Sequence, residues 1–396
     1  MLPLPATPVG DDYRLPAQAG DIQPAIPLDL YLCRACGLAQ LRHVVAREVL
    51  YGNFIYTTSV SLGLPAHFSA YAEDVARWVG APAGSLVVDI GSNDGVLLRA
   101  FQVRGYRGLG IEPAGDIARR ATDSGVKTLA RFFGAALARE VRASEGPAAI
   151  VTCNNTLANV EDLDDVADGL RELIGDSGVV SIETGYLLDL VQHELFDVIY
   201  HEHLSYFAVK PLVPFFRRHG LELVDAQRVP TKGGSIRVLV QKAGGRRSVS
   251  SEVARFVAEE EHAHLHVRSG FAKLDAHLDS TRERLEAFLA DVRSKRQRIA
   301  GYGASVGSTT FLYRLGLGPF LEFLVDDNPA KHGRLAPGTN LPVLPARAIL
   351  ERRPDFVLIL SWRYSDPIVS RLETYRAQGG IVLSPWPKWS EWIGAV

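Results

Sequence analysis

The sequence has 396 residues, of which 47% are hydrophobic and 22% are charged, and its formal net charge is −2. This length exceeds one ordinary core and predicts two or three folded domains. The composition excludes a disordered chain, and the near-neutral charge argues against a nucleic-acid-binding protein.

The chain has three cysteines, too few for a disulfide framework, so we expect a protein of the reducing cytoplasm. Residues 1–13 lack the basic and apolar regions of a signal peptide. No run of about 18 apolar residues predicts a transmembrane helix, so we expect no membrane partner.

In chain order, a proline-rich stretch at 1–45 includes a strand-like segment at 28–41. Helical periodicity follows at 67–79. A short apolar run at 86–90 then predicts a buried strand, and a glycine-bearing turn leads from it into a helix at 96–104.

From there strand-like and helix-like runs alternate, which predicts a doubly wound α/β sheet. The expected strands are 108–111, 149–153, 178–183, 221–229 and 236–241, and the expected helices are 116–124, 135–144 and 162–174.

The sequence after residue 248 becomes charged and helical, and a second α/β unit begins near 298, with strands expected at 320–326 and 355–361. We therefore divide the chain into four parts. These are an N-terminal module (1–66), a sheet domain (67–248), a helical connector (249–298) and a C-terminal Rossmann-like domain (299–396).

The run DIGSNDG at 89–95 joins the first strand of the sheet domain to its helix. A dinucleotide site needs the spacing G-x-G-x-x-G at this place, which the run lacks. Gly91 lets the backbone approach a ligand, and acidic Asp89 and Asp94 suit a cationic one. S-adenosylmethionine, with its sulfonium and ammonium groups, therefore fits better than a pyrophosphate.

Glu112 ends the second strand, about 20 residues further on, where a carboxylate can accept hydrogen bonds from both ribose hydroxyls. The acidic turn and this carboxylate together predict a cofactor site. Its expected residues are Asp89, Gly91, Asn93, Asp94, Glu112, Phe133, Asn154 and Asn155. For Phe133, stacking on adenine and packing in the core are both open.

Five motifs together resemble the sugar C-methyltransferases of deoxysugar and polysaccharide pathways, from Pro27 to about Trp389. They are DIGSNDG at 89–95, GIEP at 110–113, FDVIYHEH at 196–203, GGSIR at 233–237 and GYGAS at 301–305. The resemblance implies a zinc-binding N-terminal module, a class I methyltransferase domain and a C-terminal Rossmann-like domain. It also implies methylation of a carbon beside the ketone of a nucleotide-linked 4-keto-deoxysugar.

By this resemblance the reaction passes through an enolate. His203 is the candidate general base, because the pKa of an unperturbed imidazole lies near neutrality. Tyr200 would donate to the enolate oxygen, Glu202 would orient His203 or bind a sugar hydroxyl, and Tyr56 would reach the site. We leave out His201, which points the opposite way on an extended segment.

The nucleotide-sugar itself is expected to be thymidine-linked. Its candidate contacts are Lys232, Gly233, Gly303, Ser305 and Arg363. The turn at Gly303 and Ser305 would cradle a diphosphate with backbone N–H groups or be purely structural.

This sequence differs from the family at the expected zinc site. Relatives have two Cys-x-x-Cys pairs, which make a closed tetrahedral site. Here Cys33 and Cys36 form an incomplete half-site and Cys153 ends a buried strand, so we expect no bound zinc.

Three alternatives stay open at this point: an O- or N-methyltransferase on a sugar nucleotide, a non-catalytic nucleotide-sugar-binding protein, and an NAD-dependent oxidoreductase that uses the C-terminal glycine turn. We expect a monomer or a homodimer.

Overall fold

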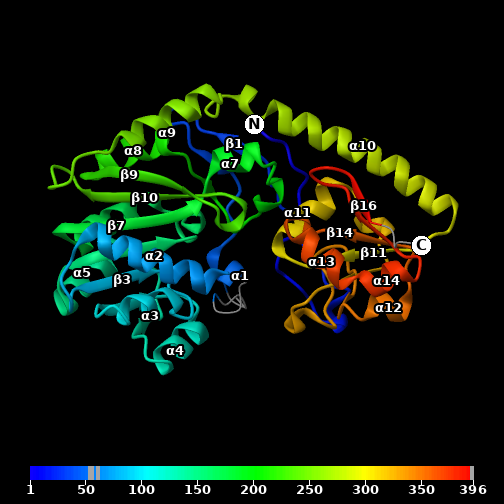
Figure 1. Cartoon of the computed structure of the whole chain (residues 1–396), viewed down its shortest axis with the longest axis horizontal. Coiled ribbons are helices and arrows are strands. Elements are labelled where there is room, and N and C mark those ends of the chain that lie inside the picture. The colour runs from blue at the N-terminus through cyan, green and yellow to red at the C-terminus, as the bar shows by residue number, and fades with distance from the viewer. Residues whose placement is uncertain (52–57, 59–62, 393–396) are drawn as a thin grey trace.

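The computed structural model describes residues 1–51, 58 and 63–392. Two α/β lobes lie next to each other, and the long helix α10 (Ala272–Ser294) spans them along one edge (Figure 1). The N-terminal segment runs between the lobes, where the Thr309 hydroxyl donates to the carbonyl of Gly10. No helix in the described ranges is long and apolar enough to cross a membrane.

The first lobe holds a seven-stranded sheet in the order β5-β4-β3-β6-β7-β10-β9. Its strands are β3 (Leu86–Ile90), β4 (Arg107–Ile111), β5 (Thr128–Leu129), β6 (Ala148–Asn154), β7 (Ile174–Gly185), β9 (Leu221–Val229) and β10 (Ser235–Lys242). The first five are parallel, and β10 is antiparallel to both of its neighbours. Because a short turn joins β9 to β10, these two strands can only pair as a hairpin.

Helices cover both faces of this sheet, which confirms the doubly wound class I architecture. One face packs against Phe68, Tyr71 and Phe101, and the other against Leu137 and Leu170. The helices of this lobe are α2 (Leu64–Val79), α3 (Val96–Gln102), α4 (Gly115–Asp123), α5 (Ala135–Glu145), α6 (Leu163–Leu173), α7 (Leu187–Gln192) and α8 (Val209–Arg218).

The segment predicted as one strand at 28–41 is two antiparallel strands, β1 (Leu30–Leu32) and β2 (Ala39–Leu41). The turn between them ends at Gly37, whose φ of 79° is readily adopted only by glycine. A third strand, β8 (Ser205–Tyr206), comes from the first lobe and pairs with β2. The N-terminal strands therefore form a three-stranded sheet together with a strand of that lobe.

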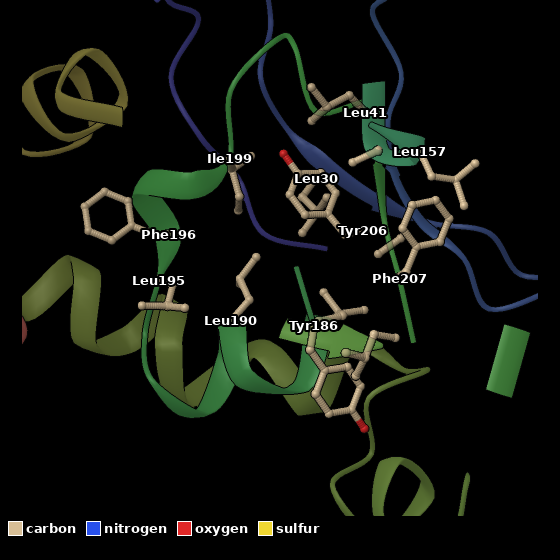
Figure 2. Close-up of a cluster of buried hydrophobic side chains, with 14 of the residues drawn as sticks. Leu30, Leu41, Leu157, Tyr186, Leu190, Leu195, Phe196, Ile199, Tyr206 and Phe207 are labelled. Atoms are coloured by element: carbon tan, nitrogen blue, oxygen red, sulfur yellow. The ribbon is translucent and has the colours of Figure 1, made fainter. Parts of the chain in front are cut away.

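Figure 2 shows the apolar cluster that this arrangement buries. Side chains of the N-terminal strands, Leu30 and Leu41, are drawn together there with Tyr206, Phe207 and Ile199 from the first lobe. This shared core fixes the chain just before and just after residues 200–203.

The second lobe holds a six-stranded sheet in the order β13-β12-β11-β14-β15-β16, parallel except for its last strand. Its strands are β11 (Ile299–Tyr302), β12 (Phe323–Val325), β13 (Val343–Leu344), β14 (Phe356–Ile359), β15 (Ile381–Ser384) and β16 (Ser390–Trp392). The remaining helices are α1 (Arg47–Tyr51), α9 (Ser251–His262), α11 (Val306–Arg314), α12 (Ala348–Arg352), α13 (Ser365–Arg371) and α14 (Glu373–Ala377).

Candidate active site

A cavity of about 540 Å³ opens at the carboxyl ends of β3, β4 and β6 and extends to the second lobe. Such a position, at the carboxyl ends of parallel strands, is where open α/β sheets bind ligands. Of the predicted residues, those that line it are Asp89, Gly91, Asn93, Glu112, Phe133, Asn154, Asn155, Tyr200, Glu202, His203, Lys232 and Ser305. The structure thus brings the cofactor candidates and the catalytic candidates into one cavity.

The glycine-bearing turn after β3 is held in a left-handed conformation. Gly91 has a φ of 70°, and a Cβ there would lie 2.0 Å from the Thr156 hydroxyl oxygen. Asn93, with a φ of 49°, accepts a hydrogen bond from the backbone N–H of Thr58 at 2.9 Å. A residue other than glycine at position 91 would be both strained and crowded.

Glu112 ties this turn to the end of β4. Its carboxylate accepts hydrogen bonds from the backbone N–H of Asn93 at 3.0 Å and of Ala114 at 2.9 Å. Burial raises the pKa of Glu112, while these two N–H groups lower it. Each carboxylate oxygen retains a lone pair that can accept from a ligand hydroxyl.

Asp89 lies at the floor of the cavity, almost fully buried. The Thr152 hydroxyl donates to its Oδ1 at 2.6 Å. Burial raises the pKa of Asp89 to about 7, and the neighbouring Glu112 charge adds to this rise. A cationic ligand at the turn would favour the ionised form of Asp89.

Asn154 ends β6 and presents a hydrogen-bond donor to the cavity. Its Oδ1 accepts from the backbone N–H of Glu183 at 3.2 Å, which fixes the orientation of the amide. Its Nδ2 is buried, as is the hydroxyl of Ser92, and neither has a hydrogen-bond partner within the described ranges. Unsatisfied buried polar atoms of this kind are the expected mark of a ligand site.

Two neighbouring aromatic residues flank the cavity. Phe133 is half-buried, whereas Phe132 is 42% exposed. The guanidinium of Arg47, on α1, lies 4.3 Å from the centre of the Phe132 ring. Both phenylalanines line the cavity.

Tyr200 and His203 form a hydrogen-bonded pair, with 3.0 Å between Tyr200 Oη and His203 Nε2. The other ring nitrogen of His203, Nδ1, lies 3.0 Å from the carbonyl oxygen of Val198. A carbonyl only accepts, so Nδ1 carries the proton and Nε2 accepts from the Tyr200 hydroxyl. Burial lowers the pKa of His203 to about 4 and raises that of Tyr200, so both are neutral at pH 7.

This geometry corrects two expectations. Val198 and Tyr200, rather than Glu202, orient the imidazole of His203. Residues 200–203 also form a turn, closed by the backbone N–H of His203 on the carbonyl of Tyr200, rather than an extended segment. His201 nevertheless points away from the cavity, where its Nε2 lies 3.2 Å from the carbonyl oxygen of Ile26.

Glu202 lines the cavity beside this pair. Burial raises its pKa to about 7, the charge of Asp11 adds to the rise, and Lys331 and Lys232 oppose it. Asp11 and Lys331 form an ion pair with 3.0 Å between Oδ1 and Nζ, and both also line the cavity. The sequence does not single out these two residues, because 320 positions separate them and neither belongs to a motif.

Four predicted residues lie outside the lining of the cavity. Asp94 lies in the glycine-bearing turn but is not part of the lining. Gly303 has a φ of 112°, and a Cβ there would lie 2.1 Å from the Ser361 hydroxyl oxygen, so this glycine serves packing. Gly233 abuts Leu195, and Arg363 pairs with Asp197. Tyr56, the remaining catalytic candidate, lies outside the described residues.

The cysteine half-site adopts a compact turn. Backbone N–H groups of Cys36 and Ala35 donate to the sulfur of Cys33 and lower its pKa. The described ranges contain no cluster of three or more histidine, cysteine, aspartate or glutamate side chains that would hold a metal ion. Since two thiols do not complete a structural zinc site, we assign no step to a metal.

Family models match the chain in three consecutive stretches. Residues 1–51 match a putative zinc binding domain, residues 66–226 a methyltransferase domain, and residues 230–387 a C-methyltransferase C-terminal domain. The chain is also 31% identical over 363 residues to the C-methyltransferase NovU of Streptomyces niveus, which covers 91% of this chain and 86% of that protein. The chain belongs to the C-methyltransferase family.

This C-methyltransferase is also similar in fold to smaller solved structures. One is the magnesium protoporphyrin IX methyltransferase of Synechocystis PCC 6803 with bound SAH (13% identity, TM-score 0.36, 50% of this chain and 92% of that one). Another is an S-adenosylmethionine-dependent methyltransferase of Clostridium acetobutylicum (9% identity, TM-score 0.35, 50% of this chain and 96% of that one). Both match about half of the present chain.

The C-methyltransferase is an S-adenosylmethionine-dependent enzyme. The residues at the turn fit that cofactor. Glu112 offers acceptors for ribose hydroxyls, and Phe133 offers an aromatic face. Asn154 Nδ2 and the Ser92 hydroxyl are buried donors without a hydrogen-bond partner among the described residues.

Proposed function

We propose that this C-methyltransferase methylates a carbon beside the ketone of a nucleoside-diphosphate-linked 4-keto-deoxysugar, with thymidine diphosphate as the first candidate nucleotide. The observation that carries the proposal is the Tyr200–His203 pair in the same cavity as the cofactor turn. This pair combines a neutral base with a neutral hydroxyl donor, which is what enolate formation from a ketone requires.

The hydrogen-bond direction within the pair suggests how the two residues act. In the resting site the Tyr200 hydroxyl occupies the free lone pair of His203. When a ketone oxygen accepts from Tyr200 instead, Nε2 of His203 becomes available as a base. Binding of the ketone to Tyr200 thus frees His203 to act as the base.

The proposed reaction can be followed bond by bond, with the cofactor supplying the methyl group and residues of this chain moving the proton. S-adenosylmethionine, when bound, supplies an electrophilic methyl group. His203 Nε2 takes the proton from the carbon beside the carbonyl, and the electron pair of that C–H bond forms the enolate. Tyr200 holds the developing negative charge on oxygen. With S-adenosylmethionine bound, the enolate carbon would form the new C–C bond as the methyl–sulfur bond breaks, and His203 would afterwards release its proton to water.

The shape of the cavity agrees with a nucleotide-linked substrate. It extends from the methyltransferase lobe to Ser305, Asn328 and Lys331 of the second lobe. We propose that the sugar lies against residues 200–203 and Lys232, and that the nucleotide part extends toward the second lobe, with Ser305 among its contacts. Deoxysugar biosynthesis in the cytoplasm is the corresponding setting, which suits a protein with free thiols.

The test is incubation of the protein with S-adenosylmethionine and a panel of thymidine-diphosphate 4-keto-deoxysugars, with products read by mass spectrometry. In D₂O without the cofactor, one ring position should exchange hydrogen for deuterium. Methylation without such exchange in any member of the panel would favour an oxygen or nitrogen acceptor. Exchange should vanish in His203→Asn and in Tyr200→Phe.

A further inference from the structure

The turn between β9 and β10 has an unusual backbone. Three consecutive residues have positive φ angles: Lys232 at 53°, Gly233 at 91° and Gly234 at 147°. Glycine adopts such angles readily, but for lysine the left-handed region costs about 1 kcal/mol. A glycine at position 232 would relieve this strain, yet the sequence has a lysine there.

The surroundings hold the turn firmly in this shape. The Thr231 hydroxyl donates to Glu183 at 3.1 Å, and the His193 Nδ1–H donates to the carbonyl of Gly233 at 2.8 Å. A Cβ on Gly234 would lie 2.3 Å from the Cβ of Asp189. Strain that the surrounding structure enforces in this way is typical of functional sites.

The strained residue faces the active site. Lys232 lines the cavity together with Tyr200, Glu202 and His203. It thus places an amine in the part of the cavity that holds the proposed enolate chemistry.

Opposing effects act on the amine of Lys232, and its pKa is lowered overall. Burial lowers the pKa of Lys232, and the nearby charge of Arg363 lowers it further, but the carboxylates of Glu183 and Glu202 raise it. Glu183 is itself fully buried and paired with Arg237 at 2.9 Å, so its charge is fixed in place.

We propose that Lys232 is a catalytic residue whose ammonium group, together with the Tyr200 hydroxyl, binds the enolate oxygen. This proposal rests on the proposed function and specifies one of its steps. A neutral hydroxyl is a weaker donor to an oxyanion than an ammonium group, since charge-assisted hydrogen bonds are roughly twice as strong. Tyr200 would recognise the ketone, and Lys232 would stabilise the charge that develops on its oxygen.

The test compares Lys232→Met with the wild type by deuterium washout from the keto-sugar and by single-turnover methyl transfer. We expect both rates to fall by about 10²- to 10³-fold, the usual effect of losing one oxyanion donor. The KM for S-adenosylmethionine should stay within about twofold, because Lys232 acts on the acceptor. Lys210→Met is the matched control, since Lys210 is an exposed lysine of α8 paired with Glu261.

Two further variants separate a catalytic role from a structural one. Lys232→Asn suits the left-handed backbone, so it should fold at least as stably as the wild type yet be as slow as Lys232→Met. Lys232→Gly leaves room for a free amine, and added ethylammonium should restore its rate about tenfold or more. Rescue of this kind does not follow from a role in folding.

These experiments distinguish failure of the proposed function from failure of the Lys232 assignment. If the wild type methylates no keto-sugar, the proposed function fails. If the wild type is active and Lys232→Met washes out deuterium within about threefold of its rate, only the Lys232 assignment fails. Trapping of the substrate on Lys232 by borohydride would also overturn the proposal, because it would show a neutral amine that forms an imine.

Discussion

Asp197 and Arg363 form an ion pair between the two lobes, with 2.7 Å between Oδ1 and the guanidinium. Asp197 is buried and lies three residues before Tyr200. Phe196, next to it, stacks on Phe311 of α11 with 5.5 Å between ring centres. The second lobe thus holds the segment that carries the proposed catalytic residues, in addition to closing the cavity.

Arg363→Met should therefore lower both stability and turnover. It leaves a buried carboxylate without its cation, which we expect to cost about 2–3 kcal/mol in the free energy of unfolding. Urea unfolding followed by circular dichroism measures the cost. The control is Arg371→Met, which removes an exposed pair with Asp327 and should change stability by less than about 0.5 kcal/mol. Equal effects of the two variants would contradict the proposed positioning role.

Glu112→Gln should weaken cofactor binding. The amide keeps the size of the side chain but removes the charge and one acceptor oxygen, so we expect a loss of about 10- to 100-fold in S-adenosylmethionine affinity. Titration calorimetry measures it, with a thermal melt to verify that the turn still folds. Glu73→Gln, on the exposed face of α2, should bind as the wild type does. Unchanged affinity of Glu112→Gln would remove Glu112 from the cofactor site.

The pH dependence of kcat/KM should show an acid limb near pH 7. The raised pKa of Glu202, about 7, means that its carboxylate is lost as pH falls through that value. His203, with a pKa lowered to about 4, stays neutral from pH 5 upward and gives no limb there. If the ionised Glu202 binds a sugar hydroxyl, activity falls on acidification, and Glu202→Gln flattens the profile. A limb that persists in Glu202→Gln would assign it to another group.

Gly91→Ala should damage both fold and binding. The left-handed φ of 70° and the contact with Thr156 together should cost about 2–4 kcal/mol. Gly80→Ala is the control, because Gly80 has a similar φ of 65° but open space around its Cα. It should lose only the strain, about 1 kcal/mol. The difference between the two melting temperatures measures the crowding by Thr156, and no difference would mean that Thr156 moves aside.

Much of the fold could be predicted from local patterns. The apolar run at 86–90 and the strand at 221–229 have the predicted bounds, because buried strands show as short apolar runs between turns. The hairpin of β1 and β2 was missed, since a single glycine at position 37 reverses the chain without interrupting the apolar pattern. The antiparallel direction of β10 likewise follows from its short connection rather than from its composition.

The sequence by itself determined the cofactor turn and the element that carries Tyr200 and His203, because each depends on residues close together in the chain. Only the tertiary structure decided which other residues lie at the cavity with them. It placed Asp11 and Lys331 in the cavity, and it brought Gly303 against Ser361 and paired Arg363 with Asp197. These assignments depend on contacts between distant segments, and such contacts follow from how the two lobes pack rather than from any local pattern.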